Sequence, residues 1–215
     1  MSWIDMVIAS LTVLVGSTLQ GSVGFGMGLL ASPILLIIDQ RFVPAPILLS
    51  TLCLTTLLTL RERHAIDVRG LRWAVIGRVA GTVLAATVLS VLSADRMTVL
   101  FGVLVLAGVG MSLSGLRLAP TGSVLVGAGA LSAVMGTIAA VGGPPMALVY
   151  QDAPGARIRA TMSGFFWVGT ILSLSALRVV GRFGMTEVSL SLVLLPSMLA
   201  GFFMSRWTAG YVDRG

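Results

Sequence analysis

The chain has 215 residues, of which 56% are hydrophobic and only 10% are charged, and its mean hydropathy is +1.02. A soluble domain carries about 25% charged residues, and it could not cover this much apolar surface with polar groups. The composition therefore excludes soluble enzymes, nucleic-acid-binding domains and secreted disulfide scaffolds. The net charge of +6 comes from arginines in short segments between long apolar runs, so we expect an all-α polytopic membrane protein.

The first apolar run, Met6–Ile38, is too long for one membrane-spanning helix. As a single helix it would be about 50 Å long, against about 30 Å of hydrocarbon. We expect it to break near its centre, at the glycine-rich segment GSVGFGMG of residues 21–28. A polar turn at residues 39–41 and an apolar helix at 42–60 follow, and after an arginine-rich loop come two helices, at 71–92 and 97–116.

The second long apolar run, Leu118–Gln151, is also too long for one membrane-spanning helix. Its centre, residues 136–145, reads GTIAAVGGPP, and we expect the helix to break there and to restart at the two prolines. A turn with Asp152 and Pro154 comes next, and helices at 160–177 and 188–205 complete the chain.

The same order of features therefore occurs twice. The sequence predicts two homologous transmembrane repeats, residues 1–116 and 122–215, joined by a loop at 117–121, and each repeat opens with a Gly-rich broken helix or helical hairpin. The helix that carries Gly81 corresponds to the helix that carries Gly201. The second repeat has no counterpart of the helix 97–116, so we expect its last helix to be missing.

Arginine placement favours inverted repeats over parallel ones. If each broken run crosses the membrane twice, most arginines fall on one side, which is the cytoplasmic bias that membrane proteins show. If each run crosses once, the repeats are parallel and the two sides are more nearly balanced. Because the half-helices are short, re-entrant hairpins stay open as a third arrangement.

Two matched helix breaks indicate a transport site near the middle of the membrane. A helix that restarts there directs unpaired N–H groups with partial positive charge at the gap, which suits an anion. Polar side chains nearby complete the pocket; they are Thr18, Gln20, Ser22 and Thr137. The alternative is that the glycines only allow tight helix packing, since Gly24 and Gly28 form a GxxxG motif.

The charged residues indicate a site less clearly than the two helix breaks do. Arg78 lies inside a predicted helix and is a candidate anion contact, but we expect it mainly to reach the membrane interface. We therefore hypothesise that backbone N–H groups near Gly28 and Pro145 hold the anion. The only histidine, His64, lies in a charged loop, and the sequence contains no motif for a metal, a cofactor or ATP, so we expect neither an enzyme nor a cofactor.

Two segments carry a family resemblance. GSVGFGMGLLASPILL, at 21–36, resembles the first-repeat motif of the TauE/SafE permeases, the sulfite exporter family also called TSUP, and GTIAAVGGPPMALVY, at 136–150, is similar to the second. The chain departs from the family pattern at Ala139 and Ala140, where a denser glycine run is expected. The resemblance implies substrate-binding residues in both motifs. With the polar candidates above they are Gln20, Ser22, Gly24, Phe25, Gly26, Gly28, Thr137, Gly142, Gly143, Pro144 and Pro145.

The resemblance implies a secondary transporter of a small anion, such as sulfite or an organosulfonate. We expect a multi-pass protein of the bacterial plasma (inner) membrane, whose partners are the lipid bilayer and the anion, and not nucleic acid; a homo-oligomer stays open. Two alternatives are a membrane-embedded binding subunit of an ATP-driven uptake system and a non-transporting assembly protein.

Overall fold

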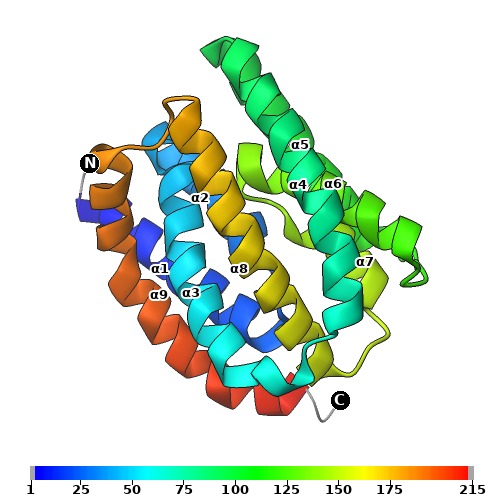
Figure 1. Ribbon diagram of the computed structural model, residues 1–215. Coiled ribbons are helices and arrows are strands. Elements are labelled where there is room, and N and C mark those ends of the chain that lie inside the picture. The colour runs from blue at the N-terminus through cyan, green and yellow to red at the C-terminus, as the bar shows by residue number, and fades with distance from the viewer. Residues whose placement is uncertain (1–2, 213–215) are drawn as a thin grey trace.

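The computed structural model describes residues 3–212, and this part of the chain is helical without any strand (Figure 1). Seven of the described helices are long and apolar enough to cross a membrane, which confirms the expected polytopic membrane protein. They are α1 (Trp3–Val23), α3 (Ala45–Glu62), α4 (Val68–Val91), α5 (Ala94–Leu113), α6 (Gly122–Ala139), α8 (Gly155–Val179) and α9 (Met185–Val212). The shorter elements are α2 (Met27–Ile38), α7 (Gly143–Tyr150) and the 3-10 turns η1 (Gln40–Phe42) and η2 (Arg63–Ala65).

Both long apolar runs break where the sequence predicts, and the chain reverses at each break. After α1, the backbone of Met27 lies beside Gly16, where a Cβ would be 3.2 Å from the Met27 Cα. After α6, the Ser132 hydroxyl donates to the carbonyl of Gly142 at 2.5 Å. The returning helices α2 and α7 are about 18 Å and 12 Å long, which is less than the hydrocarbon thickness. Each broken run is thus a hairpin of one full helix and one half-helix.

The long helices pack in pairs through small residues. Helix α9 runs parallel to α1, and α6 runs parallel to α4, while α3 packs against α8 (Figure 1). A Cβ on Gly201 of α9 would meet the Leu14 carbonyl of α1, and a Cβ on Gly81 of α4 would meet the Ala130 carbonyl of α6. Glycine lets these backbones approach closely. The two pairs are what two related repeats would form, and the internal repeat itself stays a prediction.

The charged loops gather at two opposite ends of the bundle. At the arginine-rich end, Arg61 donates to the Gly21 carbonyl at 2.8 Å, and the Arg159 guanidinium lies 3.0 Å from Glu62. Helix α1 finishes at this end, whereas α6 begins there, with Gly122 against the Trp73 ring. The first helices of the two halves therefore run in opposite directions, which supports the inverted arrangement.

One face of α1 has no helix over it in the described structure. Helix α5 covers the end of α6, so that Met135, four residues before the end of α6, is only 1% exposed. Leu19, which likewise lies four residues before the end of α1, is 41% exposed. The uncovered face lies where the predicted further helix of the second repeat would pack. That helix stays a prediction, and residues 213–215 lie outside the described part of the chain.

Candidate functional site

A small cavity of about 30 Å³ lies between the two helix breaks. The breaks touch each other, because a Cβ on Gly28 would meet the Ala140 carbonyl and a Cβ on Gly143 would lie 2.8 Å from the Phe25 ring. Helices α3, α4 and α8 complete the wall. The lining residues are Gln20, Gly26, Gly28, Leu29, Leu48, Thr51, Arg78, Gly136, Ala140, Gly142, Gly143, Phe166 and Thr170.

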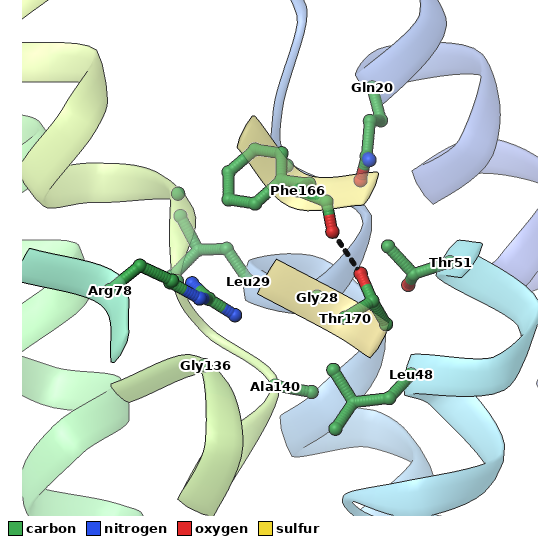
Figure 2. A pocket seen from close by; sticks show the side chains of 13 residues that line it. Gln20, Gly28, Leu29, Leu48, Thr51, Arg78, Gly136, Ala140, Phe166 and Thr170 are labelled. Atoms are coloured by element: carbon green, nitrogen blue, oxygen red, sulfur yellow. Dashed lines mark hydrogen bonds between the residues drawn. The ribbon is translucent and has the colours of Figure 1, made fainter. Parts of the chain in front are cut away.

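Arg78 extends into this cavity from the middle of α4 (Figure 2). Along the helix axis it lies about 15 Å from the start of α4 and about 20 Å from its end. Its guanidinium donates to the carbonyl and hydroxyl of Ser132, at 3.2 and 3.1 Å, and to the Ser173 hydroxyl at 3.2 Å. The Phe165 ring lies 5.2 Å away, in cation–π contact.

The expectation that Arg78 reaches the membrane interface is wrong, because the residue is only 2% exposed. Three glycines explain the difference. A Cβ on Gly136 or Gly142 would lie 3.2–3.3 Å from the guanidinium nitrogens, and one on Gly169 would overlap the guanidinium. These residues belong to other parts of the fold, and together they leave an inward space that accepts the long side chain.

The positive charge of Arg78 has no acidic partner among the described residues. The ion pairs found there lie toward the two ends of the bundle; they are Arg41–Asp39, Arg61–Glu62, Arg117–Asp152 and Arg159–Glu62. The Nε of Arg78 also has no hydrogen-bond acceptor. A buried cation at bilayer depth is costly without a counter-charge, and such residues mark functional sites.

Gln20 supplies a second unpaired donor from the opposite side of the cavity (Figure 2). Its side-chain carbonyl accepts from the backbone N–H of Met27 at 3.3 Å, which fixes the orientation of the amide. The side-chain NH₂ group is buried without an acceptor. The site therefore has donors without acceptors, as an anion requires.

The hydroxyl groups of the site are already engaged. Thr51 donates to the Ile47 carbonyl at 2.8 Å, and Thr170 donates to the Phe166 carbonyl, as Figure 2 shows. Thr137 does not line the cavity; its hydroxyl lies 2.7 Å from that of Ser173, which in turn accepts from Arg78. Thr137 is therefore connected to Arg78 only through the hydroxyl of Ser173.

The structure places the remaining candidates in two groups. Gly26, Gly28, Gly142 and Gly143 line the cavity, and Pro144 and Pro145 form the buried first turn of α7. Ser22, Gly24 and Phe25 do not line the cavity. The Ser22 hydroxyl lies 2.5 Å from that of Thr208, a Cβ on Gly24 would lie 3.1 Å from the Arg159 Cα, and the Phe25 ring packs against Gly143. The predicted site residues did not include Leu29, Gly136 and Ala140, which lie in the two motifs, or Leu48, Thr51, Phe166 and Thr170, which lie in unbroken helices without a distinctive motif.

The first turns of α2 and α7 differ in the backbone N–H groups that are available to an anion. At the start of α2, Gly28 carries an N–H group that has no acceptor within its own helix. At the start of α7, Pro144 and Pro145 have no N–H at all. The hypothesis that backbone N–H groups near both Gly28 and Pro145 hold the anion therefore has less support at Pro145, and the electropositive groups gather around Arg78, Gln20 and the start of α2.

A comparison with protein families matches the chain to a known group. The model of the family described as Sulfite exporter TauE/SafE matches residues 8–215. The chain belongs to the TauE/SafE family. The resemblance of its two glycine-rich motifs is thereby confirmed, and the chain is a multi-pass membrane transporter of the sulfite or anion type, in contact with lipid. No curated protein and no solved structure matches the chain.

Proposed function

We propose that this protein is a secondary transporter that carries a small oxyanion, such as sulfite or an organosulfonate, through the cavity between α2 and α7. The observation that carries the proposal is the buried guanidinium of Arg78, which lines the cavity without an acidic partner in the part of the chain that the structure describes. An anionic substrate would supply the missing counter-charge.

The donors around the cavity support an oxyanion as the substrate. The Nε of Arg78, the side-chain amide of Gln20 and the N–H of Gly28 come from three different helices. Oxygen atoms of one small anion would accept from all of them, and charge-assisted hydrogen bonds are the strongest of their kind. In this account Arg78 is the main contact and the start of α2 assists it, which reverses the ranking that the sequence suggested.

The present cavity is smaller than such a substrate. A volume of about 30 Å³ has room for little more than a water molecule. We therefore regard this conformation as a closed form of the transport cycle, which widens when an anion enters. Leu48 of α3 and Phe166 of α8 are the large apolar side chains that would have to move, together with Leu29 of α2.

Transport by the purified chain in liposomes, without ATP or a second protein, tests the proposal. We expect uptake of sulfite labelled with radioactive sulfur. Replacing Arg78 by Gln should lower the initial rate at least about tenfold, because the loss of a charged hydrogen bond costs about 1.5–3 kcal/mol. Arg117→Gln is the matched control and should transport normally, because Arg117 is exposed and pairs with Asp152.

The same experiment separates the alternatives. A binding subunit of an ATP-driven system would give no flux without its partner, and neither would an assembly protein. Uptake that is equal in the Arg78→Gln and wild-type proteins would show that the cavity is not the anion site. We place the protein in the bacterial inner membrane with its arginine-rich end in the cytoplasm, because positive charge accumulates on that side.

A further inference from the structure

The charge of the cavity changes when an anion binds, and this determines which steps of a transport cycle are fast. We propose that the protein is an anion exchanger, which returns across the membrane with a second anion bound and rarely with the site unoccupied. This inference rests on the proposed function, because it assumes that the anion binds at Arg78.

The cavity has one formal positive charge. Among the described residues that line it, Arg78 is the only cation, and none is Asp, Glu or His. The carboxylates elsewhere are engaged, since Glu62 pairs with Arg61 and Arg159, and Asp39 pairs with Arg41. A singly charged anion would therefore make the site neutral, and its departure would leave an uncompensated charge.

The positive charge of the Arg78 guanidinium lies inside the protein. Ser132 and Ser173 accept three hydrogen bonds from the guanidinium with neutral oxygen atoms, but they cannot cancel its charge. The central position of Arg78 in α4 prevents its side chain from reaching water at either end of the helix. When both ends of the path are closed, a lone cation in this low-dielectric setting is strongly unfavourable.

The second half of the chain places no counter-charge for Arg78 at the corresponding position. Arg78 lies three residues before Gly81, and the residue three positions before the corresponding Gly201 is Met198, which is also fully buried. Helix α9 therefore adds neither a second cation nor an acid to the site. The closed state with a singly charged anion is neutral, so it should cross between the two open forms much faster than the unoccupied state.

Counterflow in proteoliposomes tests the proposal directly. One set of vesicles contains unlabelled sulfite and the other contains gluconate, which is too large for the cavity. Labelled sulfite is added outside both, at a mildly acidic pH where it is mostly the singly charged hydrogensulfite ion. Potassium on both sides and valinomycin hold the membrane potential at zero. We expect initial uptake into sulfite-filled vesicles to be at least about tenfold faster than into gluconate-filled vesicles, which corresponds to about 1.4 kcal/mol.

The wild-type ratio of the two rates decides the proposal. Equal rates would overturn exchange and leave the proposed transport intact, whereas no uptake in either set would overturn both. Two variants then test the cause. Arg78→Lys keeps the charge and should keep the high ratio even if its rates fall. Arg78→Met introduces the residue found at position 198, and any flux that it retains should show a ratio near one; a ratio that stays at tenfold would show that the charge of Arg78 is not the reason.

Discussion

Arg78 and Gln20 approach one cavity from opposite sides, and each has a side-chain N–H group without an acceptor. The two residues come from α4 and α1, between which α2 and α3 lie in the sequence. A pocket for a cation would present carboxylates or carbonyl oxygens instead. This pair of unsatisfied donors is the structural basis for the predictions on anion binding.

Gln20→Glu should abolish anion binding, because a carboxylate in the same cavity would neutralise Arg78 and repel the substrate. Gln20→Leu, which removes a neutral donor without adding charge, should weaken binding only about three- to tenfold, since such a hydrogen bond contributes about 0.5–1.5 kcal/mol. Isothermal titration of the purified proteins with methanesulfonate measures both effects. If Glu and Leu at this position behave alike, charge in the cavity does not control binding.

The single positive charge at Arg78 predicts selection by substrate charge. Methanesulfonate and sulfate have similar tetrahedral shapes, but the first carries one negative charge and the second carries two. Methanesulfonate should bind more tightly, because a second charge would be buried without a partner. The two affinities are compared in competition with labelled sulfite, at one ionic strength. Tighter binding of sulfate would indicate a second cation near the site.

The backbone at the second break predicts opposite effects for two substitutions. Ala140 has a φ of 58°, a left-handed conformation that costs an alanine about 1 kcal/mol. Ala140→Gly should therefore raise the apparent melting temperature by about 2 °C. Gly28→Ala should lower it, because the new Cβ would overlap the Ala140 carbonyl.

Gly127→Ala is the control for these two variants, because a Cβ at Gly127 meets no atom within 4 Å. Its melting temperature should not fall. If Gly28→Ala were as stable as Gly127→Ala, the contact between the two breaks would not be as close as the structure shows.

The proposed orientation, with the arginine-rich end of the bundle in the cytoplasm, predicts which cysteine variants a membrane-impermeant reagent labels. In a Cys53→Ser background, a cysteine at His64 lies at the arginine-rich end, and a cysteine at Gln40 lies at the opposite end; both side chains are exposed. A membrane-impermeant maleimide added to intact spheroplasts should label Gln40→Cys and spare His64→Cys. Labelling of His64→Cys alone would reverse the topology.

Much of the architecture could be predicted from the sequence, because the bilayer limits helix length. Runs that are too long must break, and glycine and proline mark the place. The prediction put the first break at residues 21–28, whereas α1 continues to Val23 and only residues 24–26 are not helical. Gly21 stays in the helix because it packs against Ser205 of α9. A contact between distant segments decided this boundary, so local sequence could not show it.

The position of Arg78 could not be predicted for the same reason. A helix of this length allows an arginine either to extend along the lipid face or to turn inward. The choice depends on Gly136, Gly142 and Gly169, which make room for the guanidinium, and on Ser132 and Ser173, which accept its hydrogen bonds. Three of these five residues, Ser132, Gly169 and Ser173, lie outside the second motif, so only the fold brings the five together.

The most direct test of the account is the location of a bound anion. Selenite has the shape of sulfite, and its selenium atom scatters X-rays anomalously. In crystals of the protein grown with selenite, we predict an anomalous peak in the cavity between α2 and α7, with selenite oxygens within hydrogen-bond distance of the Arg78 guanidinium and the Gln20 amide. A selenite bound only outside this cavity, with Arg78 still in contact with Ser132 and Ser173 alone, would contradict the account.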